Sequence, residues 1–269
     1  MSETIGVISI KGGVGKTTTA INLAYTLAND YNKNVLLIDG NFSAPNIGLH
    51  LGIVEPEMSI HDVMNDKLLA AEALHEHTYN LDLLLGSLKA GKIKDPMKLR
   101  DKLKGISKKY DIIILDSSPT LNKELLGVMR ASDKLLVVTT PDPLTVKMTA
   151  HAAEVAKEKN IPIMGIILNK VRNKKYEVNT EKIERKSKIP VLATINDHLK
   201  VLESLHTIKP VVMEYPHSKT AREFKKLAAA ILNQEYRESS KFAKLKNYIK
   251  EDYTNLKQHN FKKSLFYYR

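Results

Sequence analysis

Cysteine is absent from the 269-residue sequence, and its absence excludes several kinds of site. Without cysteine the chain has no disulfide framework and no thiolate metal site, and it cannot hold an iron–sulfur cluster through cysteine ligands. A chain without disulfides fits the reducing environment of the cytoplasm. We therefore expect a cytoplasmic protein.

Long hydrophobic runs are also missing. The longest apolar segments, such as residues 163–168, have the length of a strand, well short of the roughly 18 residues that a membrane-spanning helix needs. The first ten residues, MSETIGVISI, lack a basic segment followed by a long apolar one, so no export signal is visible. We therefore expect the protein to be soluble or bound to the surface of a membrane.

Negative charge is scarce: 42 lysines and arginines face 30 aspartates and glutamates, and the net charge is +12. This excess indicates an anionic partner, either nucleic acid or an acidic membrane surface, without choosing between them. Hydrophobic residues make up 43% of the chain, enough to bury a sizeable core. We predict one domain over residues 1–233 and a basic tail over residues 234–269.

The stretch KGGVGKTT at residues 11–18 is the most specific motif in the chain. It follows an apolar run at residues 5–10 and precedes a helical pattern. Its three glycines allow the backbone to curl with its N–H groups facing inward, which forms a cradle for phosphate oxygens. Lys16 adds a full positive charge, the hydroxyl of Thr17 suits Mg²⁺, and the N-terminus of the helix favours the same anion.

One position departs from the strict phosphate-loop pattern, because Ile10 replaces the first glycine and a second lysine, Lys11, follows it. With this lysine, KGGVGKTT resembles the deviant Walker motif of the family that includes MinD and ParA proteins. In that family the extra lysine reaches across an ATP-bound homodimer to the partner's phosphates. The resemblance therefore implies an ATPase that binds ATP or ADP and forms a homodimer when ATP is bound.

A strand pattern at residues 34–38 ends at Asp39, and the loop GNFSAPNIGLHLG follows it. This region resembles the first switch of MinD proteins, where a second aspartate, two residues after the first, positions or deprotonates the attacking water. Here that second position is Asn41, whose amide can hydrogen-bond to water but cannot accept its proton. The resemblance assigns Lys11, Lys16, Asp39 and Asn41 to the catalytic site, and the departure predicts slow or absent hydrolysis. Alternatively, Asp39 or a backbone carbonyl orients the water.

A second acidic residue follows an apolar strand, since the run DIIIL at residues 111–115 leads to Asp116. Ligands of open parallel sheets bind at the carboxyl ends of the strands, where Asp39 is also expected. Asp116 resembles the Walker B aspartate, and the SSPT that follows resembles the second switch of the family. We predict that Thr17, Asp39 and Asp116 surround Mg²⁺. An aspartate that only caps a helix is the alternative.

A strand pattern at residues 161–168 is followed by Asn169. In the MinD/ParA family an asparagine at this place reads the edge of adenine with its amide, although asparagine also suits an ordinary strand end. By resemblance, the nucleotide-binding residues are Lys11, Gly12, Gly13, Val14, Gly15, Lys16, Thr17, Thr18 and Asn169.

Strand and helix patterns alternate along the chain, which is typical of a parallel sheet with right-handed crossovers. We predict an α/β fold with a doubly wound, mainly parallel sheet flanked by helices, as in P-loop NTPases, and a C-terminal helical tail. Strands are expected at residues 5–10, 34–38, 80–85, 111–115, 134–139, 161–168, 191–195 and 210–213. Helices are expected at residues 17–28, 59–65, 68–74 and 221–231, within the lysine-rich residues 89–109, and after Pro141, where Val146, Ala150, Ala153 and Val155 face inward.

The tail from residue 234 is rich in lysine and arginine, and its apolar residues share one face of a predicted helix. These residues are Phe242, Leu245, Ile249, Tyr253 and Leu256. A basic amphipathic helix of this kind resembles the C-terminal segment with which MinD proteins bind acidic lipid once a dimer presents two copies. Packing on the domain, a helical dimer seam and binding to nucleic acid are the alternatives.

Two functions are consistent with these sequence features. The first is a MinD-like ATPase that positions cellular machinery on a membrane, and the second is a ParA-like ATPase that binds DNA without sequence preference. The DNA would bind through basic patches such as residues 89–109. Alternatively, these residues form only a solvent-exposed face with no partner. A bacterial tyrosine kinase, indicated by Tyr267 and Tyr268, is a third class. The first two place the protein in the cytoplasm, on the membrane or on the nucleoid, with a cargo or activator that the sequence does not name.

Overall fold

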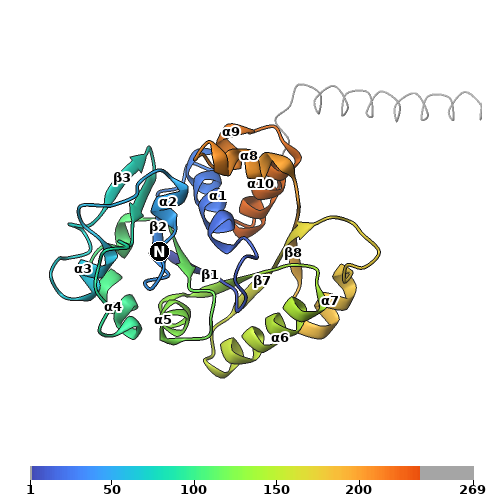
Figure 1. Ribbon diagram of the computed structural model, residues 1–269, viewed down its shortest axis with the longest axis horizontal. Helices are drawn as coiled ribbons and strands as arrows, with labels where there is room; N and C mark the ends of the chain where they lie inside the picture. The colour runs from blue at the N-terminus through green and yellow to red at the C-terminus, as the bar shows by residue number, and fades with distance from the viewer. Residues whose placement is uncertain (1, 237–269) are drawn as a thin grey trace, which may run out of the picture. The chain divides into compact units, whose positions relative to one another are not determined.

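An eight-stranded sheet lies between two layers of helices in the computed structural model, which describes residues 2–236 (Figure 1). The strand order is β3-β4-β2-β5-β1-β6-β7-β8, and every neighbouring pair is parallel except β3 with β4. The strands are β1 (Glu3–Ile8), β2 (Val35–Gly40), β3 (His75–Thr78), β4 (Leu81–Leu84), β5 (Ile112–Ser117), β6 (Lys134–Thr139), β7 (Ile163–Val171) and β8 (Val191–Asn196).

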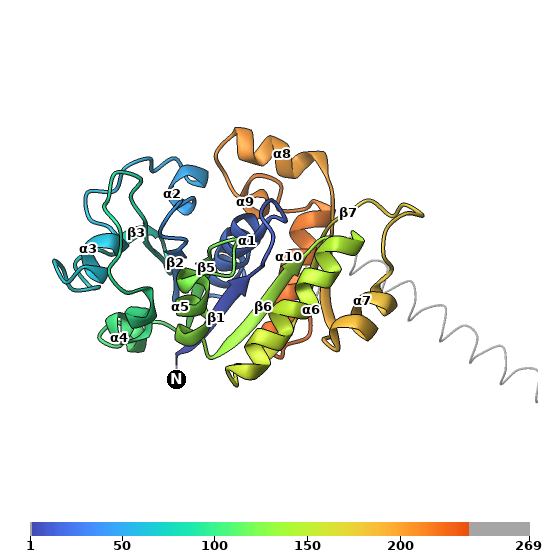
Figure 2. The same cartoon turned by 60° about the horizontal axis from the view of Figure 1, so that its bottom comes forward.

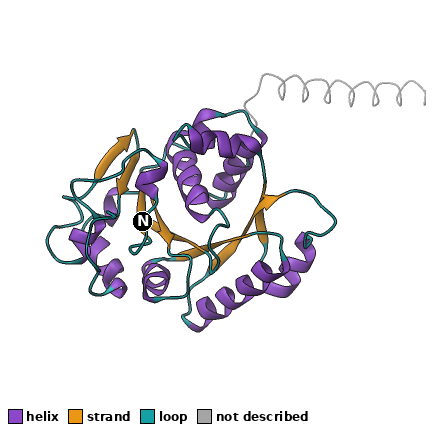
Figure 3. Cartoon of the chain, in the orientation of Figure 1, coloured by secondary structure: helices purple, strands orange, loops and turns teal. Residues whose placement is uncertain are grey.

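The helices fall into two layers, which lie on either side of the sheet in Figure 3 and are seen from another direction in Figure 2. Helices α1, α9 and α10 cover one face of the sheet, and α3 to α7 cover the other. Their bounds are α1 (Lys16–Asn29), α2 (Ile47–His50), α3 (Ile60–Met64), α4 (Leu99–Leu103), α5 (Lys123–Ala131), α6 (Pro143–Glu158), α7 (Thr180–Ser187), α8 (Leu199–His206), α9 (Val211–Glu214) and α10 (Lys219–Ile231).

The apolar runs form strands that are buried on both faces. In β5, Ile112 and Ile114 enter the core under α1 and α10, while Ile113 and Leu115 enter the core on the opposite face. Successive side chains of a strand point to opposite faces, so a sheet covered on both sides needs continuous apolar sequence. With the strand order, this confirms the predicted doubly wound, mainly parallel sheet flanked by helices.

Two predicted elements are wrong. Residues 68–74 form turns instead of a helix, and Leu69 is exposed there. Residues 210–213 form no strand, because Pro210 begins the short helix α9, whose Val211 and Val212 pack under α1 and α10. The helix predicted within residues 89–109 is present as the short α4, with one 3₁₀ turn before it and one after it.

The buried stripe of α6 also differs from the prediction. Beside Val146 it buries Thr149, Ala152 and Ala156, whereas Ala150, Ala153 and Val155 are only partly buried. The prediction counted apolar residues alone, and Thr149 can be buried because its hydroxyl bonds to the Thr139 hydroxyl at 2.8 Å and to the Thr145 carbonyl at 2.9 Å.

The predicted amphipathic tail lies outside the described residues, since the structure describes nothing beyond residue 236. Its helix, the apolar face from Phe242 to Leu256, and the domain boundary at residue 233 remain predictions. Among residues 2–236, no helix combines the length and the apolar character that crossing a membrane requires.

Candidate nucleotide-binding site

The loop between β1 and α1 has the backbone conformation that its glycines allow. Gly13 and Gly15 have φ angles of 76° and 87°, in the left-handed region that residues with a Cβ rarely adopt. Gly15 is also the N-cap of α1, and no side chain there bonds to the first N–H groups of the helix. Those groups and the positive end of the helix dipole are therefore available to an anion.

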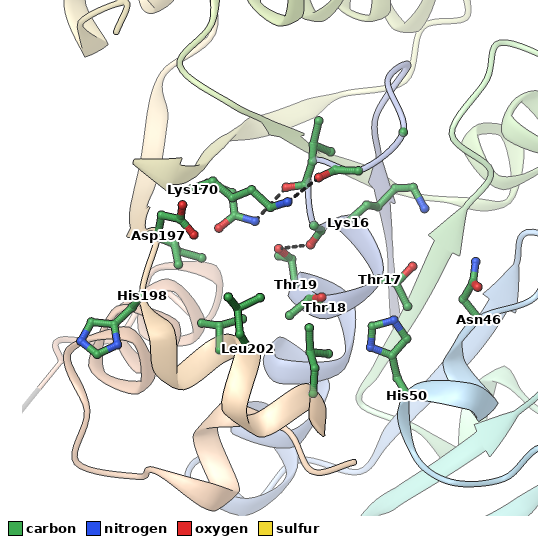
Figure 4. Close-up of a pocket in the computed structure, with 18 of the residues that line it drawn as sticks. Lys16, Thr17, Thr18, Thr19, Asn46, His50, Lys170, Asp197, His198 and Leu202 are labelled. Atoms are coloured by element: carbon green, nitrogen blue, oxygen red, sulfur yellow. Dashed lines mark hydrogen bonds between the residues drawn. The ribbon is translucent and has the colours of Figure 1, made fainter. Parts of the chain in front are cut away.

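A cavity of about 550 Å³ opens over this loop, at the carboxyl ends of the strands (Figure 4). All nine predicted nucleotide-binding residues line it, together with Asn41, Asn46 and His50 from the first predicted switch. At the far end its wall is formed by Asp197, His198 and Leu202, at the junction of β8 and α8. Phosphate-binding groups thus occupy one end and a mixed polar and apolar wall the other, as a nucleotide requires.

Lys16 is paired with the predicted Walker B aspartate. Its Nζ lies 2.8 Å from Asp116 Oδ1 and also donates to the Ser117 carbonyl. The Thr17 hydroxyl donates to the other carboxylate oxygen of Asp116 at 2.5 Å. Lys16 is only 7% exposed and Asp116 is fully buried, so this is a buried ion pair at the base of the loop.

Asp39 lies beside Asp116, because the two residues are partners in the β2–β5 register. Both are fully buried, beneath the cavity instead of on its wall. Asp39 accepts hydrogen bonds from the backbone N–H groups of Asn41 at 3.2 Å, Asn46 at 2.7 Å and Ile47 at 3.0 Å. It therefore shapes the switch loop.

Burial, and then the neighbouring charge of Asp116, raise the pKa of Asp39 to about 7, while the three backbone N–H groups lower it. Of these two adjacent buried carboxylates, the salt bridge of Lys16 is made to Asp116, and Asp39 is held by backbone N–H groups, so a divalent cation would offset the remaining negative charge. The oxygens of Thr17, Asp39 and Asp116 are the hard ligands that Mg²⁺ prefers, directly or through water. The residues present therefore fit the predicted magnesium site.

We expect the free energy of unfolding, measured in EDTA, to fall as the pH rises through 7. The pKa of Asp39 is about 7 in the folded protein and near 3.8 when unfolded, so the folded state binds more protons between these values. Stability is then highest below the unfolded pKa and is lost as the pH rises through the folded one. Denaturant titrations from pH 5 to 9 measure the slope. An equally steep slope in Asp39→Asn would contradict the assignment to Asp39.

Asn41 lines the cavity, and its side chain is held by its own loop. The residue is 4% exposed, and its Nδ2 donates to the Ala44 carbonyl at 2.5 Å. The amide nitrogen is therefore engaged in a turn, and the amide oxygen can accept a hydrogen bond from water. Nothing in this arrangement gives Asn41 the ability to take a proton.

Lys11 contacts residues of its own chain. Its Nζ lies 3.3 Å from Asp142 Oδ1 and 2.7 Å from the Thr145 hydroxyl, at the start of α6. Burial alone would raise the pKa of Asp142, but hydrogen bonds from Thr140, Thr145 and Lys11 hold it well below its usual range. The sequence analysis missed Asp142, although an aspartate before a proline and a helix is a recognisable N-cap.

The comparisons with known proteins agree with this geometry. A family model described as an AAA domain matches residues 2–163. An uncharacterised ATP-binding protein of Methanocaldococcus jannaschii is 32% identical over 230 residues, covering 84% of this chain and 87% of that protein. The septum site-determining protein MinD of Synechocystis is 27% identical (87% and 91% covered), and a virulence plasmid ParA family protein of Chlamydia psittaci is 28% identical (86% and 95% covered).

Solved structures of MinD proteins have the same fold. The cell division ATPase MinD of Pyrococcus furiosus superposes with a TM-score of 0.81 at 29% identity, covering 87% of this chain and 99% of that one. The septum site-determining protein MinD of Pyrococcus horikoshii, complexed with Mg-ADP, gives 0.80 at 28% identity, with 86% and 96% covered. The chain belongs to the MinD/ParA family of P-loop ATPases. The predicted family is therefore confirmed.

In this MinD/ParA chain, Asn169 lines the cavity but is turned toward the phosphate loop. Its Nδ2 donates to the Val14 carbonyl at 2.8 Å. Because only the NH₂ group can donate to a carbonyl, this bond fixes which end of the amide is the oxygen. The role of Asn169 in reading adenine remains a prediction, now with a defined acceptor for the base.

Two hydrogen bonds that the sequence analysis missed connect the two predicted switch loops to the N-terminal end of α5. The Ser43 hydroxyl of the first loop donates to Glu124 Oε1 on α5, and Glu124 Oε2 is buried with no hydrogen-bond partner among residues 2–236. Asn122, the N-cap of α5, accepts from the Ser118 hydroxyl of the second loop at 2.9 Å. The N-cap was visible as an asparagine before a helical pattern, but nothing in the sequence pattern pairs Ser43 with Glu124.

Proposed function

We propose that this protein is an ATP-dependent dimerising switch of the MinD type, which positions cell-division or other cellular machinery and hydrolyses ATP slowly. The observation that carries the proposal is the placement of Lys11. It lies on the rim of the phosphate loop with its side chain 36% exposed, next to the deeper Lys16. A partner's phosphates can reach a lysine on the rim, whereas Lys16 is confined to its own site.

The proposed ligand is Mg-ATP, or Mg-ADP after hydrolysis, with its phosphates on the loop and its base toward Asn169 and Asp197. The bond between Asn169 and Val14 leaves the Asn169 amide oxygen to accept from the exocyclic amine of adenine. Guanine carries a carbonyl oxygen at the same place, and two acceptors would repel each other. This supports ATP over GTP, and Mg²⁺ would bind among Thr17, Asp39 and Asp116.

The experiment that tests the proposal is light scattering after gel filtration, with Mg-ATP, with Mg-ADP and without nucleotide. The parent should form a dimer with Mg-ATP alone. Lys11→Ala should still bind nucleotide but remain a monomer, because Lys11 serves the partner's site. If Lys11→Ala dimerised as readily as the parent, the proposed switch would be wrong.

Releasing Lys11 from Asp142 should promote dimerisation. We expect Asp142→Asn to dimerise with Mg-ATP at a roughly two- to fivefold lower protein concentration, because a partly exposed ion pair is worth about 0.2–1 kcal/mol. Asparagine caps a helix as well as aspartate does, so α6 should keep its N-cap. Sedimentation equilibrium measures the shift.

The matched control for this prediction is Asp30→Asn. Asp30 pairs with Lys225 at 2.9 Å and is the C-cap of α1, at the end of that helix opposite the phosphate loop. That variant should dimerise like the parent. An equal shift in both variants would mean that net charge, and not the release of Lys11, controls dimerisation.

A ParA-like function is the second candidate, and one surface favours it. Residues 89–109 carry exposed lysines at Lys92, Lys94, Lys98, Lys108 and Lys109. Binding to DNA of any sequence, lost with rising salt and dependent on ATP, would support this candidate. Sedimentation with acidic lipid vesicles, lost on truncation after residue 234, would instead support the MinD-like role.

A further inference from the structure

Two residues at the end of β7 contact the phosphate loop, and both line the same cavity as the loop. Lys170 Nζ donates to the Gly13 carbonyl at 2.7 Å, and Asn169 Nδ2 donates to the Val14 carbonyl at 2.8 Å. Both bonds are drawn as dashed lines beside Lys170 in Figure 4. Two consecutive residues of one strand therefore hold two consecutive carbonyl groups of the loop, about 155 residues earlier in the chain.

The backbone of β7 is distorted at this place. Lys170 has a φ angle of 56°, in the left-handed region that is unfavourable for a residue with a side chain. The β7–β8 register also shifts between Leu168 and Val171. In a regular strand, successive side chains point to opposite faces, and an irregularity of this kind changes their directions. Here it brings Asn169 and Lys170 to the same loop.

Gly15 leaves space in the loop for the Asn169 side chain, because glycine has no Cβ. A Cβ placed on Gly15 would lie 2.2 Å from Asn169 Nδ2, so any other residue at position 15 would displace the amide. The φ angle of Gly15, 87°, excludes other residues for a second reason. Gly15 therefore makes room for Asn169 besides allowing the backbone to turn.

The direction of these two bonds determines where the loop's donors point. In a trans peptide the C=O group and the N–H group of the next residue point in opposite directions, and the described residues contain no cis peptide. When the Gly13 carbonyl is held by Lys170, the Val14 N–H group must face the other way. Holding the Val14 carbonyl through Asn169 fixes the Gly15 N–H group in the same manner. Both N–H groups belong to residues that line the cavity.

We infer that Asn169 and Lys170 form a positioning element that holds the phosphate loop in its binding conformation before the nucleotide arrives. Its ligand class is a nucleoside diphosphate or triphosphate, because the N–H groups that it orients are those of the phosphate cradle. Preorganised donors bind more tightly than donors that must be ordered on binding. The ligand in this inference rests on the proposed nucleotide-binding function, whereas the effect on the loop does not.

The test is Lys170→Met, which keeps the length of the side chain and removes its donor. In the nucleotide-free protein, ¹⁵N relaxation should show the order parameters of residues 12–15 falling from about 0.85 to below about 0.6. Calorimetric titration with ADP should show affinity about tenfold weaker, the size expected for one lost charged hydrogen bond. Lys170→Arg retains a cationic donor and should restore both measurements.

Lys188→Met is the matched control. Lys188 shares the left-handed backbone, with a φ angle of 58°, but is the C-cap of α7 and does not line the cavity. It should leave loop order and ADP affinity within about twofold of the parent. Unchanged order parameters in Lys170→Met would overturn the inference, even if ADP affinity fell, because Lys170 would then act on the nucleotide directly. A parent that failed to bind ADP would refute the proposed function, while the order parameters would still decide whether Lys170 holds the loop.

Discussion

Replacing Lys16 by methionine is expected to abolish nucleotide binding and to destabilise the fold at the same time. The ammonium group is the main positive charge inside the phosphate loop, and losing it should weaken Mg-ADP binding by about a hundredfold or more. It is also the cation paired with the fully buried Asp116. Removing one partner of a buried ion pair leaves an uncompensated charge, which costs about 3–5 kcal/mol. Calorimetry and urea titration measure the two effects.

The double variant Lys16→Met/Asp116→Asn separates these effects. With the charge of Asp116 removed together with its partner, it should regain most of the lost stability, yet it should still fail to bind Mg-ADP. A matched surface variant, Lys225→Met, breaks the partly exposed pair with Asp30 and should cost less than about 1 kcal/mol. If the double variant were as unstable as Lys16→Met alone, packing of the lysine stem would be the cause, and the buried charge would not.

The central strands could be predicted because their environment is uniform. A strand buried on both faces requires apolar residues at consecutive positions, and β5 and β6 meet that requirement. The run at residues 134–139 even matches the bounds of β6. The edge strand β3 was missed, because its sequence HEHT is polar and its residues are at least partly exposed. An edge strand has one strand neighbour, so its sequence is less constrained.

The phosphate loop could be predicted because its function requires particular residues at fixed spacing. The residues that contact this loop could not be predicted, because they lie far from it in the sequence. Lys11 meets Asp142, 131 residues away, only because the loop after β1 and the start of α6 lie at the same edge of the sheet. The role of Lys170 could not be predicted for another reason: it depends on the left-handed backbone conformation of Lys170 itself, in an irregular part of β7.

Asn41→Asp is expected to raise ATP turnover about a hundredfold, because a positioned general base contributes roughly 10² to 10⁴ in rate. Asn41 lines the cavity beside the phosphate loop, and its amide can orient water without accepting a proton. A carboxylate at the same position would do both. The measurement is phosphate release at saturating Mg-ATP, with turnover and the Michaelis constant reported separately, since a base should act on turnover.

The substitution should also lower the stability of the folded protein, which provides a second measurement. Aspartate cannot donate to the Ala44 carbonyl, and it adds a third carboxylate near the fully buried Asp39 and Asp116. We therefore expect Asn41→Asp to be less stable than the parent in EDTA, and to recover when Mg-ATP supplies compensating charge. Asn46→Asp is the control, because Asn46 makes a similar bond to Ala44 at 2.7 Å and lines the same cavity. Rapid turnover in the parent that Asn41→Asp fails to increase would show that Asp39 or the backbone already orients the water, and that this chain never needed the missing carboxylate.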